Sequence, residues 1–197
     1  QAIIGFGGGS SMDCAKATAA RIAKPHQSLA QMKGILKIHK KLPLLIAIPT
    51  TAGTGSETTL AAVITDAETR HKYAINDFPL IPRYAVLDPK VTLSLPPFIT
   101  ATTGMDALTH AVEAYTCMAA NPISDAYATA AIKKVSNSLF NVLDNPTDEF
   151  GRLELAQAST MAGIAFSNSM VGLVHSLGHA LGAVAHLPHG LCMNLFL

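Results

Sequence analysis

The sequence predicts an α/β half with a parallel sheet over residues 1–96, followed by an all-α half over residues 97–197. Two observations predict this fold class. Before residue 95, short apolar runs alternate with glycine-rich loops and a helix-permissive segment, which is typical of parallel α/β units. After the double proline at residues 96–97, the apolar runs suited to strands give way to long alanine-rich segments, so a domain boundary is expected there.

The α/β half begins with a strand, a turn and a helix. Residues 3–6 form an apolar run, residues 7–10 are Gly-Gly-Gly-Ser, and residues 12–23 are rich in alanine, which favours a helix. A second buried strand is expected at residues 42–48, followed by the hydroxyl-rich loop 50–56. Further short strands are predicted at residues 61–65 and 84–87.

The second half predicts helices because its segments are alanine-rich, long enough for several turns, and bounded by Gly, Asn or Pro. These helices are expected at residues 102–119, 124–141, 151–167 and 171–184. The polar residues 143–149 are expected to connect two of them.

The composition limits the class of partner. Of the 197 residues, 49% are hydrophobic and 14% are charged, so most of the chain is expected to pack rather than to stay disordered. Fourteen Lys and Arg against thirteen Asp and Glu leave a net charge of +1, which gives no reason to expect a nucleic-acid or membrane partner. No apolar run reaches the about 20 residues that a transmembrane helix needs. Three widely spaced cysteines without a CxxC pair favour a reducing, cytoplasmic setting.

Two loops of the first half suit a phosphate-bearing ligand. The glycine turn 7–10 lies between a strand and a helix, where backbone N–H groups can approach a pyrophosphate. Its spacing departs from the dinucleotide-binding fingerprint by having Ser10 in place of the third glycine, so a simple tight turn is an equal alternative. The hydroxyl-rich loop follows a predicted strand, where open α/β sheets bind ligands, although each hydroxyl alone is better explained as a cap or turn.

Histidine and aspartate spacing in the second half predicts a metal site. Asp106 and His110 are four residues apart in a predicted helix, and His175 and His179 repeat this spacing in another, so each pair shares a helix face. His189 is expected in a turn nearby in the sequence. One carboxylate and three of these four imidazoles suit Fe(II) or Zn(II) with positions left open for substrate, but the spacing does not say which histidine is spare.

Four motifs occur in order along the chain. They are Gly7-Gly8-Gly9-Ser10-x-x-Asp13-x-Ala15-Lys16, Pro49-Thr50-Thr51-Ala52-Gly53-Thr54-Gly55-Ser56-Glu57, Gly104-Met105-Asp106-Ala107-Leu108-Thr109-His110-Ala111-x-Glu113-Ala114-Tyr115, and His175-x-x-x-His179-x-x-Gly182 followed by Pro188-His189-Gly190. Together they closely resemble the iron-containing (group III) alcohol dehydrogenases. The resemblance implies a dehydroquinate-synthase-like architecture, in which residues 1–96 form a partial Rossmann-like dinucleotide-binding domain and residues 97–197 a partial helical metal-binding domain, with the active site in the cleft between them.

The resemblance also implies a reaction and its residues. It is hydride transfer between a primary alcohol or aldehyde and NAD or NADP, with Fe(II), or Zn(II), as a Lewis acid. The implied metal ligands are Asp106, His110, His175 and His189, which leaves His179 beside the nicotinamide as a candidate proton relay. The implied cofactor-binding residues are Gly8, Gly9, Ser10, Asp13, Thr50, Thr51, Thr59, Lys72 and His179. Ala61 and Phe166 match positions that line the substrate pocket.

Members of this family are about twice as long, so the chain is expected to be a central fragment. The residue that would contact the adenosine ribose is missing, and the choice between NAD and NADP is therefore open. The full-length protein is expected to be a homo-oligomer. Two alternatives remain open: a zinc-dependent polyol dehydrogenase or dehydroquinate-synthase-like lyase, and a non-catalytic fragment that binds cofactor or metal.

Overall fold

The computed structural model describes residues 2–66 and 72–197, which fall into two compact units. The described residues of 1–50 and 56–86 form the N-terminal unit, and residues 51–55 and 87–197 form the helical unit. The chain passes finally from one unit to the other between Val86 and Leu87. The expected domain limits at residues 96 and 97 remain a prediction.

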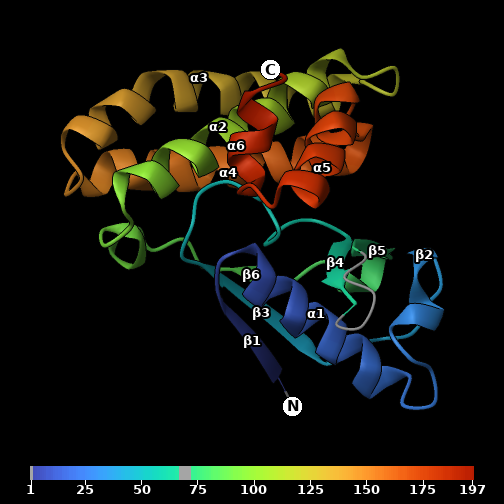
Figure 1. The fold of residues 1–197 in the computed structure, drawn as a ribbon. Helices are drawn as coiled ribbons and strands as arrows, with labels where there is room; N and C mark the ends of the chain where they lie inside the picture. Colours follow the sequence, from blue (N-terminus) through green and yellow to red (C-terminus); the bar gives the residue numbers. More distant parts are fainter. Residues whose placement is uncertain (1, 67–71) are drawn as a thin grey trace. The chain divides into compact units, whose positions relative to one another are not determined.

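A three-stranded parallel sheet lies in the N-terminal unit. Its order is β1 (Ala2–Gly7), β3 (Leu44–Pro49) and β6 (Tyr84–Ala85), and helix α1 (Gly9–Ala23) follows β1 and packs against it (Figure 1). Isoleucines and leucines favour the extended backbone of β1 and β3, where Leu45 is buried and Ile4 and Leu44 are exposed. The predicted strand–turn–helix beginning and the parallel sheet are confirmed.

A second small sheet in this unit differs from the expected all-parallel pattern. It has the order β2 (Gly34–Ile35), β5 (Lys72–Asn76) and β4 (Ala61–Thr65), and its β4–β5 pair is antiparallel. The reason is the short stretch of sequence between Thr65 and Lys72, because a parallel crossover needs a dozen or more residues. A buried hydrophobic cluster joins helix α1 to this second sheet. Its members are Ala20, Met32, Ile38, Ala62, Ile75 and Leu80.

The helical unit contains a short 3-10 helix, η3 (Pro89–Thr92), and helices α2 to α6. The helices are α2 (Pro97–Thr116), α3 (Pro122–Asp144), α4 (Glu149–Ser169), α5 (Leu173–Ala185) and α6 (His189–Asn194). The four predicted helices are confirmed within a few residues, and α6 replaces the expected turn at His189. Pro97 and Pro122 each occupy the first helical position, where a missing N–H costs nothing.

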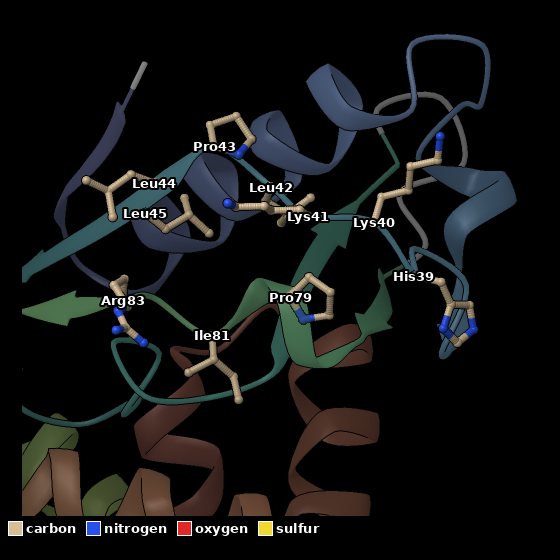
Figure 2. Close-up of a pocket in the computed structure, with 10 residues that line it drawn as sticks. All are labelled: His39, Lys40, Lys41, Leu42, Pro43, Leu44, Leu45, Pro79, Ile81 and Arg83. Carbon is tan, nitrogen blue, oxygen red and sulfur yellow. The ribbon is translucent and has the colours of Figure 1, made fainter.

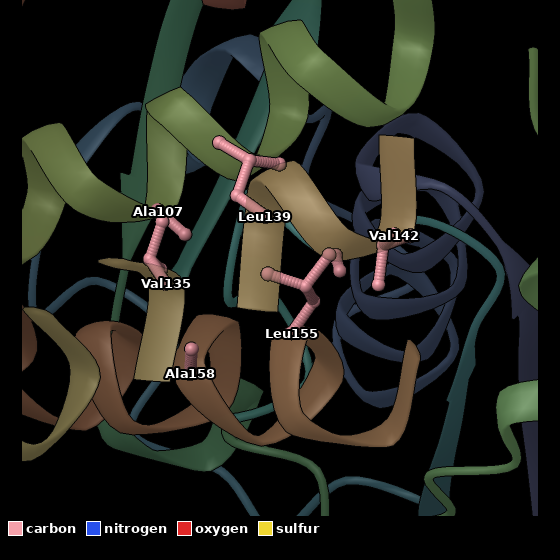
Figure 3. Packing of buried hydrophobic residues seen from close by; sticks show 7 residues of the cluster. Ala107, Val135, Leu139, Val142, Leu155 and Ala158 are labelled. Carbon is pink, nitrogen blue, oxygen red and sulfur yellow. The ribbon is translucent and has the colours of Figure 1, made fainter. Parts of the chain in front are cut away.

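Helices α2, α3 and α4 pack side by side around an aliphatic core (Figure 1). Figure 3 shows its members from all three helices: Ala107, Val135, Leu139, Val142, Leu155 and Ala158. Alanines form a second buried cluster along the same helices and allow close approach of their backbones. Among the helices of the described residues, none is both long and apolar enough to span a bilayer.

Candidate metal centre

Three helices of the helical unit bring the four predicted metal ligands together. Asp106 and His110 lie one turn apart on α2, His175 lies in the first turn of α5, and His189 is the first residue of α6. One ligand atom from each residue lies within 4.8 Å of the others. One carboxylate and three imidazoles in such a cluster are a donor set for a divalent transition metal.

Burial makes this cluster costly without a cation. Asp106 and His175 are only 2% and 4% exposed, and His110 is also buried. Within the described part of the chain, Asp106 Oδ1 and His175 Nε2 are buried atoms without a hydrogen-bond partner, and they lie 3.8 Å apart. Asp106 Oδ1 also lies 3.4 Å from His189 Nε2. Buried polar atoms normally have partners, so these two orphaned atoms fit a metal ion bound between them.

Burial shifts the pKa values of Asp106 and His110 in opposite directions. Burial raises the pKa of Asp106 well above its ordinary value, and the nearby Glu113 carboxylate raises it further. Burial, followed by the neighbouring His175 and His189, lowers the pKa of His110 well below its ordinary value. A bound cation would lower the pKa of Asp106 and so favour the ionised carboxylate, and it would lower the pKa of His110 further and keep the imidazole neutral.

A backbone carbonyl fixes the orientation of His110. Its Nδ1 lies 3.2 Å from the carbonyl oxygen of Gly53, so Nδ1–H donates and the Nε2 lone pair is left for a metal. Glycine is needed at position 53, since a Cβ there would lie 2.8 Å from both Cβ and the carbonyl oxygen of Thr103 on α2. The loop 51–55 therefore contributes to the metal site through its backbone, a role that the sequence did not reveal.

Glu113 contacts one of the predicted ligands, and no role was predicted for it from the sequence. It is buried on α2, and its carboxylate accepts a hydrogen bond from the backbone N–H of His175 at 3.2 Å and also contacts Nδ1 of that ring. Its spacing could have indicated a position near the metal site. Glu113 follows His110 by three residues and Asp106 by seven, so it shares their helix face.

His179 and Phe166 lie at the edge of the cluster. His179 is exposed, one turn after His175 on α5, with its ring centroid 5.1 Å from that of His189. The Phe166 ring on α4 stacks on His110 with centroids 4.5 Å apart. Phe166 therefore forms an apolar wall beside the cluster, and its position in a substrate pocket stays a prediction.

The glycine turn of the N-terminal unit has the geometry expected of an anion-binding loop. Gly7 has φ of +140°, which favours glycine, and a Cβ there would lie 2.4 Å from Ser11 Oγ. Gly8 is the N-cap of α1 and Gly9 its first residue, and no side chain among those described caps this helix. Ser10 is exposed in the first turn. The N-terminus of α1 thus offers backbone N–H groups and the positive end of the helix dipole.

Asp13 and Lys16 tie α1 to the segment that follows β3. Asp13 accepts hydrogen bonds from Ser56 Oγ at 2.7 Å and from the backbone N–H of Val63 at 3.0 Å. The buried Lys16 ammonium donates to the Thr59 carbonyl at 2.9 Å, to Thr59 Oγ1 at 3.1 Å and to the Ala61 carbonyl at 2.8 Å. Burial lowers the pKa of Lys16 to about 8, against the opposing charges of Asp13 and Glu57. Lys16 belongs to the first motif, but no role was predicted for it.

The remaining predicted cofactor residues are spread over several elements. Thr50 follows β3, and its backbone N–H donates to the Gly7 carbonyl at 2.9 Å, which joins the hydroxyl-rich loop to the glycine turn. Thr51 belongs to the helical unit. Lys72 is an exposed residue at the start of β5, on the second sheet. Thr50 is therefore hydrogen-bonded to the glycine turn, whereas Lys72 lies in the second sheet and not in the sheet that contains β1 and β3.

A groove of about 680 Å³ on the N-terminal unit contains none of the predicted site residues (Figure 2). Basic side chains occur along it with aliphatic ones, and its lining includes His39, Lys40, Lys41, Leu45, Ile81 and Arg83.

An α/β unit with a glycine turn and a helical unit with an Asp-His cluster define a class of proteins built to bind a phosphate-bearing ligand and a metal ion. Two family models match this chain: "Iron-containing alcohol dehydrogenase" over residues 1–89, and "Fe-containing alcohol dehydrogenase family, C-terminal" over residues 100–197. The chain belongs to the iron-containing alcohol dehydrogenase family.

Individual relatives agree with this assignment. The chain is 45% identical over 188 residues to "Probable alcohol dehydrogenase EutG" of Salmonella typhimurium, covering 95% of this chain and 47% of that protein. It is 42% identical to "NAD-dependent methanol dehydrogenase" of Bacillus methanolicus, covering 98% and 51%. The solved structure of an alcohol dehydrogenase from Oenococcus oeni is 40% identical with a TM-score of 0.93, covering 98% and 50%. The chain spans about half the length of the curated relatives it matches.

Proposed function

We propose that the protein containing this chain transfers a hydride between a primary alcohol or aldehyde and NAD or NADP, with Fe(II) or Zn(II) bound by Asp106, His110, His175 and His189. The observation that carries the proposal is the Asp-His cluster, in which Asp106, His110 and His175 are buried, and Asp106 Oδ1 and His175 Nε2 have no hydrogen-bond partner among the described residues. Family membership supports the reaction class.

The residues of the helical unit have different proposed roles in the reaction. A divalent ion in this site would supply Lewis acidity toward the substrate oxygen. The Gly53 carbonyl holds the His110 ring in place, and the Phe166 ring that stacks on His110 excludes water from one side of the cluster. His179, exposed and next to His189, is placed to carry the hydroxyl proton between substrate and solvent.

The N-terminal unit is proposed to bind the cofactor. Backbone N–H groups of Gly8, Gly9 and Ser10 hold the pyrophosphate at the start of α1, which the helix dipole favours. Asp13 stabilises the position of this loop by accepting hydrogen bonds from Ser56 Oγ and from the backbone N–H of Val63. Thr50, Thr59 and Lys72 of this unit are proposed as further cofactor contacts, and Thr51 stays a predicted one. A relative named as an NAD-dependent methanol dehydrogenase supports a nicotinamide cofactor.

The substrate is proposed to be a small alcohol or aldehyde. Phe166 of the helical unit is proposed to contact it beside the metal centre, and Ala61 of the N-terminal unit stays a predicted pocket residue. The small side chain of Ala61 would leave room for more than a methyl group. The intact protein is further proposed to act in the cytoplasm as a homo-oligomer, which analytical ultracentrifugation of the full-length protein would test.

The proposal is tested by metal analysis together with alcohol-dependent reduction of NAD⁺ and NADP⁺ by the full-length protein. Asp106→Asn keeps the shape of the side chain but removes the anionic ligand, so it is expected to lose both metal and activity. Asp144→Asn, at an exposed acid in the same unit, is the matched control and is expected to retain both. Activity of metal-free protein would refute the proposal, and preference for glycerol over primary alcohols would replace it with a polyol dehydrogenase.

A further inference from the structure

Glu113 reaches from α2 to the beginning of α5. Its side chain is buried, and its two carboxylate oxygens contact one residue at two points: Oε1 accepts from the backbone N–H of His175, and Oε2 lies against Nδ1 of the His175 ring. The chain approaches closely here, because a Cβ on Gly172 would lie 3.2 Å from Glu113 Oε1. Glu113 therefore fixes both the backbone and the ring of a proposed metal ligand.

The backbone contact alone would be a structural role. His175 is the third residue of α5, whose N-cap is Gly172, and the first N–H groups of a helix have no partner within the helix. A carboxylate from another helix satisfies one of them and interacts favourably with the helix dipole. This contact explains why an acidic side chain is buried at this point.

The ring contact has a chemical consequence. An ionised carboxylate only accepts hydrogen bonds, so His175 Nδ1 must carry the proton and Nε2 must present its lone pair. Nε2 lies 3.8 Å from Asp106 Oδ1, and neither atom has a hydrogen-bond partner among the residues that the structure describes. An imidazole nitrogen with a free lone pair and a carboxylate oxygen both accept hydrogen bonds and cannot satisfy each other, whereas a cation between them would satisfy both.

We propose that Glu113 is a positioning residue, which sets the tautomer and orientation of His175 so that Nε2 faces the metal. The inference rests on the proposed metal site and extends it to a residue beyond the four ligands. Hydrogen-bond partners of metal-bound histidines typically contribute about 10- to 100-fold to metal affinity.

Glu113→Gln separates the two roles, because an amide has one acceptor and one donor. The backbone N–H of His175 can only donate, whereas a neutral imidazole can exchange tautomers. The arrangement that satisfies every group has the amide oxygen on the backbone N–H and the amide NH₂ donating to Nδ1. Nε2 then carries the proton and presents an N–H group, not a lone pair, to Asp106 Oδ1. The variant is thus expected to keep its fold and to lose metal affinity.

The experiment uses the full chain and Co(II) and Zn(II) as probes. Affinity is measured by chelator competition, the ligand field by the Co(II) absorption spectrum, the tautomer of metal-free His175 by ¹⁵N NMR, and folding by thermal unfolding of the metal-free protein. Glu113→Gln is expected to bind both ions about 10- to 100-fold more weakly and to show the Nε2–H tautomer, with an unchanged unfolding temperature. Glu154→Gln, which breaks an ion pair with Lys134 in the same unit, is the matched control and is expected to bind as wild type.

The outcomes separate this proposal from the one on which it rests. Wild-type affinity and spectrum in Glu113→Gln would overturn the positioning role, above all if the variant also unfolded at lower temperature, and would leave the metal site intact. If the variant does not fold, Glu113→Asp takes its place, and wild-type affinity in that variant overturns the role in the same way. No binding of either ion by the wild-type chain would overturn both proposals.

Discussion

Lys16→Met is expected to remove a specific pH dependence of stability from the N-terminal unit. The Lys16 ammonium is 1% exposed and donates to the carbonyl oxygens of Thr59 and Ala61. Burial lowers its pKa from 10.5 to about 8, despite the opposite charges of Asp13 and Glu57. The unfolded chain keeps the ordinary value, so between pH 8 and 10.5 the unfolded state binds more protons than the folded state. The free energy of unfolding therefore rises with pH across this window.

The size of this rise follows from the two pKa values. A difference of about 2.5 pH units at about 1.36 kcal/mol per unit gives about 3 kcal/mol as the full contribution, of which about half is gained by pH 9.5. Methionine has a similar length and does not titrate, so the variant lacks this contribution at every pH. Other titrating groups are common to both proteins and cancel in the difference between them.

Urea unfolding followed by circular dichroism at pH 7.5, 8.5 and 9.5 measures this difference. The wild-type chain is expected to gain stability relative to Lys16→Met as the pH rises, and the exposed Lys40→Met variant controls for loss of a lysine. If the stability curves of wild type and Lys16→Met run parallel over this range, Lys16 keeps an ordinary pKa and the reasoning from its burial is wrong.

Two further predictions concern the metal centre. His175→Ala is expected to abolish metal retention, because it removes a buried ligand, whereas the exposed His179→Ala is expected to keep the metal and slow turnover. Metal analysis with steady-state kinetics checks this, and equal metal loss in both variants would contradict the division of roles. Gly53→Ala is expected to cost about 1–3 kcal/mol of stability and to weaken Co(II) binding, because its Cβ would meet Thr103 at 2.8 Å and displace the carbonyl that holds His110. Thermal unfolding and Co(II) titration measure both effects. The control Gly182→Ala, whose Cβ would meet Cys192 Sγ at an ordinary 3.4 Å, should show neither effect, and equal behaviour of the two variants would refute the steric argument.

Local sequence patterns predicted much of the fold because the relevant signals are local. The strand–turn–helix beginning and the four long helices follow from apolar runs, glycine and proline positions, and alanine content. Strand β5 was not anticipated, since Lys-Tyr-Ala-Ile-Asn is short and has polar residues at both ends. Its antiparallel pairing with β4 depends on the short separation of two strands, only one of which was recognised.

The candidate site could be predicted from the sequence only in part. Helical spacing brought Asp106 and His110 to one face, but it could not choose between His175 and His179, because both lie on the same face of α5. The choice depends on α6, which places His189, and on Glu113, which contacts His175. Glu113, Lys16 and the Gly53 carbonyl act through contacts with residues distant in the sequence, and no local pattern reports such contacts.

The loop 51–55 also determines how this protein can be recombined with its relatives. The loop belongs to the helical unit, although the residues before and after it belong to the N-terminal unit. Within it, a Cβ on Gly55 would lie 2.7 Å from the Gly163 backbone of α4, so the loop and its helix must match closely. A chimera joined only between Val86 and Leu87 would pair the loop of one parent with the helices of the other. Exchange of the helical unit therefore requires two separate pieces of gene, and the shorter one encodes only five residues.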